Sequence, residues 1–122
     1  MSGKIHLCRA YDLRDGAKAP GAHLLVDRIW PRGVAKEDLD LDDWLKDIAP
    51  SDDLRKWFDH DPDKWDEFQK RYRAELDDAS DAVEEALKWV RKGAVTLIYG
   101  AKDDEHNQAV VLRDYLGEKR DA

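Results

Sequence analysis

The sequence predicts an α/β fold in which a small, mostly parallel sheet of about three strands is flanked by helices on both faces. Two apolar runs, residues 23–29 and 94–99, have the composition of strands that are buried on both sides. The segment between them has helical spacing, and a long helical crossover joins strands that run parallel. We find no internal repeat and no linker, so residues 1–122 are expected to form a single domain.

The first strand is expected at residues 5–8, where apolar and polar side chains alternate weakly. Its direction is left open, because residues 9–22 contain glycine and proline but no clear helical stripe. The second strand, residues 23–29, has Leu24 and Leu25 followed by another aliphatic residue, which suits a strand that is covered on both faces.

A helix is predicted over residues 41–48, directly after the second strand and its loop. Apolar side chains recur there at positions i, i+3, i+4 and i+7 and mark one helix face. This helix must end before Pro50, because a proline disfavours the helical conformation of the residue that precedes it. The apolar positions are Leu41, Trp44, Leu45 and Ile48.

Three further helices are predicted from their first residues. Ser51 caps a short helix, Asp61 with Pro62 forms a cap and first-turn pair that opens a longer one, and Ser80 begins the next. Their inward-facing side chains are expected to be Leu54, Trp57 and Phe58, then Trp65, Phe68, Tyr72 and Leu76, then Val83, Ala86, Leu87 and Val90.

The clearest strand is residues 94–99, which are rich in β-branched and aromatic side chains. Lys92 and Gly93 precede it and read as a helix end. A last helix is predicted from about Asn107 to Gly117. If the two long apolar strands are parallel, the loops that follow them project from the same edge of the sheet.

The composition excludes several classes of function. Basic residues number 21 and acidic residues 28, so the formal net charge is −7, which argues against non-specific binding to nucleic acid. A local group of arginines remains able to hold one small anion. Five tryptophans and four tyrosines argue against disorder, because these side chains remove a large area from water when a core forms.

The chain is expected to be cytoplasmic, because it has no apolar stretch of the length that a membrane span or a signal segment needs. Cys8 is the single cysteine, which excludes an intrachain disulfide and a cysteine metal cluster within one chain. No cofactor and no oligomeric state can be assigned from the sequence.

A ligand site is predicted where the loops "DRIWPRG" and "YGAKDDEHN" meet at the carboxyl edge of the sheet. The start of the last helix adds free backbone N–H groups and the positive end of a dipole. The expected ligand is a small anion, phosphate-bearing or nucleotide-like. The predicted site residues are Arg28, Trp30 and Arg32 from the first loop and Lys102, Asp103, His106 and Asn107 from the second.

Each of these side chains also has a structural interpretation. As site residues, Arg28 and Arg32 would clamp the anion, Lys102 would neutralise charge, and His106 would act as an acid or base. As structural residues, Arg28 would pair with Asp27 or Asp103, and Asn107 would cap the helix.

The turn that carries His60 and Asp61 has the same two interpretations. It is explained by capping and by packing of the flanking aromatic residues, and it would also serve as one wall of the ligand crevice.

Two other classes of function are open at this stage. A protein-interaction module would use exposed tryptophans, such as Trp30 and Trp57, as anchors for a partner. A phosphatase-like hydrolase would use Cys8 and Arg14, which have the bare spacing of a cysteine phosphatase loop but no glycine between them. Regulation through DNA binding is the least favoured, because no basic recognition helix is recognisable.

Three motifs in order, "LVDRIWPRG", "WLKDIAPSDDLRKWFDHDPDKWDEF" and "LIYGAKDDEHNQAVVLRDYL", resemble the YeaO-like members of the domain-of-unknown-function family 488. The resemblance extends over almost the whole chain. It implies a compact prokaryotic domain with a Rossmann-like, doubly wound core, and it implies no activity.

The chain departs from the longer relatives in that family at the last strand and helix. Those relatives have a Cys, Ala, acidic loop and then Cys-His-Arg at the helix start. Here Tyr99 and Gly100 occupy the region of the first cysteine, and His106, Asn107 and Gln108 stand where Cys-His-Arg would be. Thiol chemistry is therefore not expected at this position of the chain.

Overall fold

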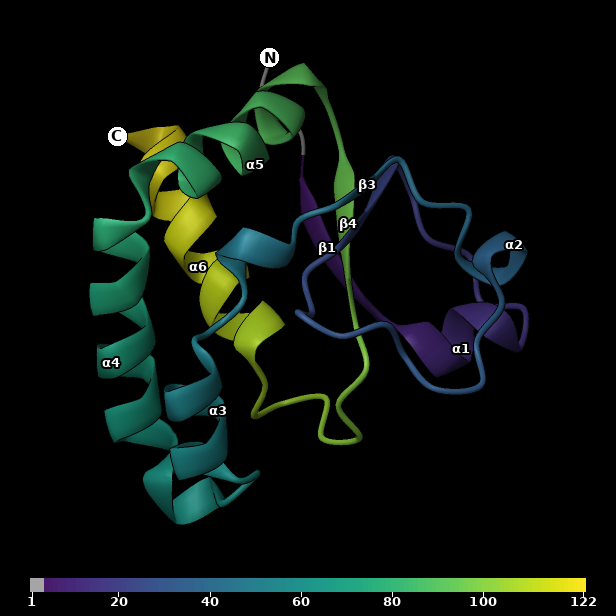
Figure 1. Ribbon diagram of the computed structural model, residues 1–122. Coiled ribbons are helices and arrows are strands. Elements are labelled where there is room, and N and C mark those ends of the chain that lie inside the picture. The colour runs from purple at the N-terminus through teal and green to yellow at the C-terminus, as the bar shows by residue number, and fades with distance from the viewer. Residues whose placement is uncertain (1–3) are drawn as a thin grey trace.

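The computed structural model describes residues 4–122, which form a four-stranded, all-parallel sheet in the order β1-β4-β2-β3. The α/β prediction is confirmed, with one strand more than expected. The strands are β1 (Ile5–Arg9), β2 (Ala22–Leu25), β3 (Asp43–Trp44) and β4 (Val95–Tyr99). The strand β4 lies in the centre and pairs with both β1 and β2, so all the carboxyl ends face the lower edge in Figure 1.

Helices cover the two faces of the sheet unequally. One face, here called the helix-rich face, is covered by α3 (Asp52–Phe58), α4 (Trp65–Asp78), α5 (Ser80–Lys92) and α6 (Gln108–Asp121). The other, the thin face, is covered by two short helices, α1 (Ala10–Arg14) and α2 (Lys36–Leu39). Two short 3₁₀ helices, η1 (Lys46–Ile48) and η2 (Pro62–Lys64), complete the order of elements.

Alternation along β2 assigns its side chains to the two faces. Leu24 and Leu25 are both fully buried, but Leu24 belongs to the core of the helix-rich face and Leu25 to that of the thin face. This follows from the two-residue period of a strand, in which successive side chains point to opposite sides. The unbroken apolar run that predicted burial on both sides is thereby confirmed.

The prediction of a helix over residues 41–48 is wrong. Leu45 donates its backbone N–H to Leu25 O (2.8 Å), and the segment forms β3 and then η1. Trp44 packs on the thin face and Leu45 on the helix-rich face, so the apolar residues serve two cores rather than one helix stripe. Pairing with β2 satisfies the backbone here and overrides the local helical spacing.

The sequence predicts neither α1 nor α2, which are only five and four residues long. The other predicted elements differ from the structure only in their ends. The strand expected over residues 23–29 stops at Leu25, although Val26 still donates to Ile98 O (3.0 Å). The last helix continues through Gly117 to Asp121, since a glycine within a helix costs only about 1 kcal/mol relative to alanine. The direction of β1, which had been left open, is parallel to β4.

The predicted helix starts have different physical origins. Ser51 Oγ accepts the N–H of Leu54 (3.2 Å), and Asp61 accepts that of Asp63 (3.0 Å), so both caps are confirmed. A helix does begin at Ser80, but no side-chain cap bond forms there. In the described part of the chain, no helix has the length and apolar character needed to cross a membrane.

Candidate functional site

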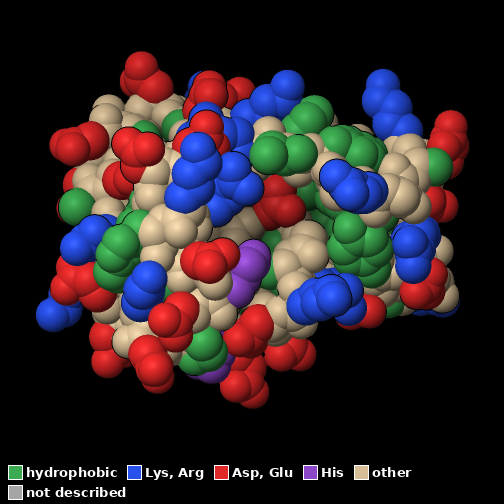
Figure 2. Space-filling view, turned by 60° about the horizontal axis from the view of Figure 1, so that its bottom comes forward, with side chains coloured by type: hydrophobic (Ala, Val, Ile, Leu, Met, Phe, Trp, Pro, Cys, Tyr) green, Lys and Arg blue, Asp and Glu red, His purple; other side chains and the backbone are tan. Residues whose placement is uncertain are grey.

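The main candidate site is a pocket of about 220 Å³ at the carboxyl ends of β2 and β4, on the helix-rich side. We call it the Asp27 pocket. Figure 2 shows the face on which it opens, where a hollow bordered by basic side chains and a histidine has an acidic side chain deep inside. The polar side chains that line it are Asp27, Arg28, Arg55, His60, His106, Asn107 and Gln108.

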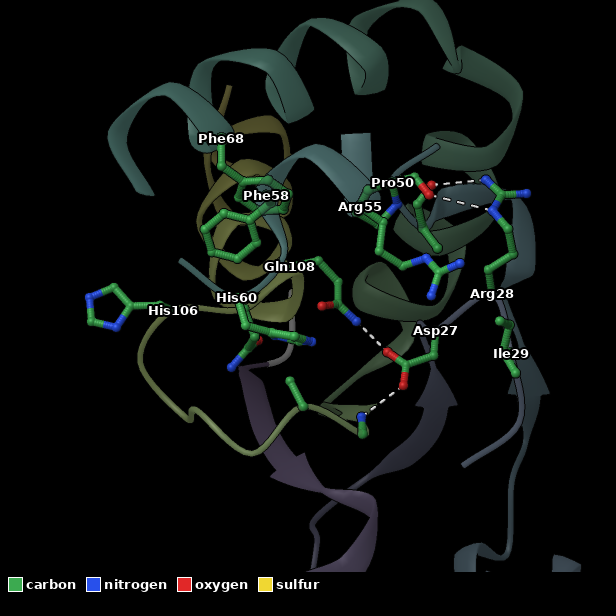
Figure 3. A pocket seen from close by; sticks show the side chains of 14 residues that line it. Asp27, Arg28, Ile29, Pro50, Arg55, Phe58, His60, Phe68, His106 and Gln108 are labelled. Atoms are coloured by element: carbon green, nitrogen blue, oxygen red, sulfur yellow. Dashed lines mark hydrogen bonds between the residues drawn. The ribbon is translucent and has the colours of Figure 1, made fainter. Parts of the chain in front are cut away.

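Asp27 lies at the centre of this pocket, just after β2 (Figure 3). One carboxylate oxygen accepts the backbone N–H of Gly100 (2.7 Å), and the other accepts the side-chain amide of Gln108. These bonds join the end of β2 to the end of β4 and to the first residue of α6. Strand pairing ends at this point. The backbone of Val26 still bonds β4, but at the next residue the side chain of Asp27, and not its backbone, bonds the end of β4.

The carboxyl group of Asp27 has a raised pKa, about 6. Burial is the largest cause, since it disfavours the charged form. The Gly100 N–H, the Gln108 amide and the guanidinium of Arg55 act in the opposite direction and limit the rise. Asp27 therefore changes its charge close to neutral pH while lining a pocket, as titrating groups at functional sites often do.

Two arginines border the pocket in different ways. Arg28 donates to the carbonyl oxygens of Ala49 (3.1 Å) and Pro50 (3.4 Å), so its guanidinium holds the segment before α3 in place. Arg55 extends from α3, and its guanidinium points toward Asp27 in Figure 3. Among the described residues no hydrogen bond joins Arg55 to Asp27, and Arg55 donates instead to Asp52 (3.4 Å) on the same helix. Arg55 is thus the more available cation of the two.

An apolar wall faces these charges. Phe58 and Phe68 stack with their ring centroids 4.3 Å apart. Ile29 also lines the pocket, and 61% of it is exposed, which makes it the one large hydrophobic residue of the described chain that is exposed. His60 reaches the wall because it and Asp59 adopt left-handed backbone conformations (φ 54° and 46°) that close the turn after α3.

His106 and Asn107 line the same pocket but serve the loop before α6. His106 shares a hydrogen bond with Asp103 (2.9 Å), and its ring lies edge-on to Trp65 (5.1 Å) and points away from Asp27 (Figure 3). Asn107 caps α6 by accepting the N–H groups of Ala109 and Val110. The capping interpretation of Asn107 is therefore confirmed.

The remaining predicted residues lie elsewhere. Asp103 accepts the N–H groups of Glu105 and His106, which stabilises a turn and lowers the pKa of its carboxyl group. Arg32 is exposed and does not line the Asp27 pocket. Trp30 faces a hollow on the thin side, and Lys102 faces another near α1. The structure thus brings together three of the seven predicted site residues, namely Arg28, His106 and Asn107.

The sequence predicts no role in the site for three of the polar residues that line the pocket. Asp27 was considered only as a partner for Arg28, and Gln108 only as a departure from the family pattern. Arg55 carries no sequence signal, because it is one of several charged residues on the outer side of a short helix. The signal that Asp27 did offer was its place as the first charged residue after a buried strand, where ligands bind in parallel sheets.

The geometry around Cys8 does not favour a nucleophilic thiol. The pKa of the Cys8 thiol is raised, mainly by burial and also by the charge of Asp12. The residues between Cys8 and Arg14 form the end of β1 and the helix α1 rather than an open phosphate loop. Arg14 pairs with Asp15 at 3.0 Å.

The two tryptophans considered as interaction anchors are partly covered. Trp30 donates to Val34 O (2.8 Å) and packs edge-on against Trp44 (5.4 Å). Trp57 is covered by the guanidinium of Arg71, 4.1 Å from the ring centroid. Neither indole forms an exposed patch, so burial removes the main support for the interaction module.

Comparison with known protein families identifies the family of this chain. Residues 4–122 match the model described as the inactive DUF488-N3 subclade. This protein belongs to the DUF488 family. No solved structure shows a significant match to the chain.

Similar proteins cover nearly the same length. The chain is 40% identical to the uncharacterized protein YeaO of Escherichia coli, over 92% of this chain and 96% of the relative. It is 37% identical to an uncharacterized protein of Mycobacterium tuberculosis, over 93% of each chain. An uncharacterized protein of Mycobacterium bovis matches to the same extent. The resemblance that the three sequence motifs indicated is thus confirmed.

Proposed function

We propose that this DUF488 protein binds a small anionic ligand, a phosphate-bearing molecule with a hydroxylated ring, in the Asp27 pocket and does not turn it over. The observation that carries the proposal is the opposition of one buried carboxylate and one available guanidinium across a pocket with an apolar wall. A carboxylate accepts hydrogen bonds from hydroxyl groups, and a guanidinium donates hydrogen bonds both to hydroxyl oxygens and to oxyanions.

The size of the pocket limits the ligand. Its volume of about 220 Å³ lies below the roughly 300–1,000 Å³ of pockets that hold drug-sized molecules. A single ring, such as a ribose, fits this space, and the rest of a larger ligand would lie outside it. Each oxygen of Asp27 already accepts one bond from the protein, and a carboxylate oxygen has a second lone pair that is left for a donor on the ligand.

The non-catalytic part of the proposal has separate support. The family model that matches the chain is described as inactive. As the family resemblance implies, Tyr99 and Gly100 occupy the region of one cysteine of the longer relatives, and His106-Asn107-Gln108 stands where they have Cys-His-Arg. The imidazole of His106, the predicted acid or base, is turned away from Asp27 and lies against Trp65.

Titration with ribose 5-phosphate and with adenosine 5′-monophosphate, followed by two-dimensional amide NMR, tests the proposal. The amides of Gly100, Gln108 and Arg55 are expected to shift with saturation, and phosphorus NMR is expected to detect no turnover. Absence of saturable shifts at these amides with both probes would contradict ligand binding. Turnover of either probe would contradict the non-catalytic role.

A matched pair of variants makes the test specific. Arg55→Ala removes the available guanidinium and is expected to weaken binding by about tenfold or more, because a hydrogen bond to a charged group contributes about 1.5–3 kcal/mol. Lys56→Ala removes the same charge from the next residue of α3, which does not line the pocket. Equal losses in the two variants would indicate a general charge effect and would argue against a contact with Arg55.

A further inference from the structure

A second hollow lies beside the Asp27 pocket, at the carboxyl ends of β1 and β4 near α1. It has a volume of about 450 Å³ and is more open than the Asp27 pocket. Three cationic side chains line it, Arg9 from the end of β1, Arg14 from α1 and Lys102 from the loop after β4. We call it the basic hollow. In a chain of net charge −7, three cations converging from three elements form an unusual local site for an anion.

Tyr11 organises the two arginines of the basic hollow. The guanidinium carbons of Arg9 and Arg14 each lie 5.2 Å from the centroid of the Tyr11 ring, within the range of a cation–π contact. The hollow also contains two carboxylates. Arg14 lies 3.0 Å from Asp15, and Arg9 lies 3.7 Å from Asp12. These pairs offset two of the charges and leave Lys102, which is exposed and forms no ion pair within the described residues, as the excess cation.

Arg9 has an unused hydrogen-bond donor. Its Nε atom is buried and is the one buried side-chain nitrogen or oxygen in residues 4–122 that has no hydrogen-bond partner. Buried polar groups in folded proteins are almost always satisfied, so an unsatisfied one needs an explanation. An oxygen of a bound oxyanion would supply the missing acceptor, and the planar guanidinium is suited to phosphate.

Gly100 lies between the two hollows and lines both of them. A Cβ atom at this position would lie 2.9 Å from a carboxylate oxygen of Asp27, which is closer than real contacts allow. The absence of a side chain therefore lets Asp27 bond the backbone at the end of β4. The backbone of Gly100 is thus a wall that the Asp27 pocket and the basic hollow share.

We propose that the basic hollow holds the phosphate group of the ligand whose ring lies in the Asp27 pocket, with Arg9 and Lys102 as its main contacts. This inference rests on the proposed function, which supplies the ring end of the ligand. It adds the position of the phosphate and restricts the ligand to a sugar phosphate or a nucleoside monophosphate that extends across Gly100.

The inference is tested by comparing matched ligands with and without phosphate. Adenosine is compared with adenosine 5′-monophosphate, and ribose with ribose 5-phosphate, by amide NMR titration of the full chain. The phosphorylated member of each pair is expected to bind about tenfold more tightly or better. It is also expected to shift the amides of Arg9 and Lys102 in addition to those of Gly100 and Gln108.

Three variants assign the contact. Lys102→Ala is expected to lower the affinity for the phosphorylated ligand about fivefold more than the affinity for its unphosphorylated partner. Arg9→Lys keeps the charge but removes Nε, and it is expected to have the same selective effect. The control is Lys88→Ala, which removes an exposed lysine of α5 that lines neither hollow. An equal effect of Lys88→Ala would overturn the assignment.

The outcomes separate the two proposals. Suppose that ligands shift the amide signals of Gln108 and Gly100, but that the phosphate group adds no affinity and Lys102→Ala has no selective effect. The inference is then overturned, and the proposed function stands. If no ring ligand shifts Gln108, the proposed function fails, and the inference fails with it. Inorganic phosphate alone is titrated as a last probe. Saturable binding of phosphate at Arg9 and Lys102 without any ring ligand at Gln108 would identify an independent oxyanion site and would overturn the link across Gly100.

Discussion

The two faces of the sheet differ greatly in the size of their cores. On the helix-rich face, 21 buried residues form one cluster with α3, α4, α5 and α6. On the thin face, five buried residues form a second cluster with α1 and α2. Each face ends in its own hollow at the carboxyl edge, the Asp27 pocket on the helix-rich face and the basic hollow beside α1.

This difference explains why the two hollows have different characters. The Asp27 pocket is walled by side chains from α3, α4 and α6, so its carboxylate is buried and its pKa is raised. The basic hollow is walled by the end of β1, one short helix and a loop, so most of its charges stay in contact with water, although Arg9 Nε is buried. Burial strengthens electrostatic interactions, and solvent screens them. Under the proposed function, the helix-rich face would therefore provide selectivity, and the thin face would provide an accessible group of cations.

The largest expected effect compares Leu24→Ala with Leu25→Ala. Both leucines are fully buried and adjacent on β2, but they belong to different cores. Leu24→Ala is expected to lower the free energy of unfolding by about 3–5 kcal/mol, because many fixed neighbours keep the cavity open. Leu25→Ala is expected to lower it by about 2–3 kcal/mol, because the smaller cluster can relax into the space. Urea denaturation of both variants measures the difference, and equal losses would remove the distinction between the faces.

The pH dependence of stability tests the burial of Asp27. Its pKa is raised to about 6, so between about pH 4 and pH 6 the folded state holds a proton that the unfolded state has lost. The contribution of Asp27 to stability is therefore full below about pH 4 and is lost as the pH rises through 6. A shift of about two pH units corresponds to roughly 2–3 kcal/mol.

The variant Asp27→Asn isolates this contribution, because an amide does not titrate. The stability difference between the wild type and Asp27→Asn, from urea denaturation at several pH values, is expected to fall as the pH rises from 4 to 7. Asp78→Asn, at an exposed aspartate of α4, serves as the control. A difference that stays constant with pH would show that Asp27 is ionised throughout this range.

A smaller effect is expected from buried hydroxyl groups, one on each face. Tyr72 donates to Ile48 O (2.6 Å) on the helix-rich face, and Thr96 donates to Pro20 O (2.8 Å) from the centre of the sheet. Tyr72→Phe and Thr96→Val are each expected to cost about 1–2 kcal/mol, because each leaves a carbonyl without its donor. Similar costs, measured by thermal denaturation, would show that the faces differ in apolar packing and not in polar bonding. The hydroxyl of Tyr11 forms no hydrogen bond within the described residues, so Tyr11→Phe is expected to change stability by less than about 0.5 kcal/mol.

The smallest effect concerns helix starts on the helix-rich face. Ser51 caps α3 and also donates to a carboxylate oxygen of Glu75 (2.6 Å), so Ser51→Ala is expected to cost about 1 kcal/mol. Ser80 begins α5 without a cap bond, and Ser80→Ala is expected to be neutral or slightly stabilising, since alanine is the better helix former. Circular dichroism during urea denaturation distinguishes the two. A loss at Ser80 as large as that at Ser51 would contradict the assignment of the caps.

The sequence was sufficient for elements whose signals are local. The strand at residues 94–99, the cap at Ser51 and the start of the last helix at Asn107 were all predicted, because apolar runs and capping side chains act within a few residues. The exception is residues 41–48, where helical spacing was present but β3 formed. The backbone bond from Leu45 to Leu25 decides that segment, and no local pattern encodes it.

A pocket lies at the edge of the sheet where the sequence predicts a site, but only part of the predicted residues line it. Strand order alone indicated that the loops after two parallel strands meet, and Arg28, His106 and Asn107 do line one pocket. The loops did not indicate Arg55, because it comes from a helix that the crossover returns to the same edge. The loop sequences also gave no sign that Lys102 lines the basic hollow together with Arg9, instead of the Asp27 pocket together with Arg28.

The sequence by itself determined the α/β class, the parallel central strands, the starts of α3, α5 and α6, and the family. The tertiary structure alone decided which charged residue is buried. Asp27 is bonded to Gly100 and Gln108, which lie 73 and 81 residues further along the chain, and these contacts remove it from water. A carboxyl group becomes a titrating pocket residue through its surroundings and not through its own identity. Those surroundings exist only once the sheet and α6 have come together.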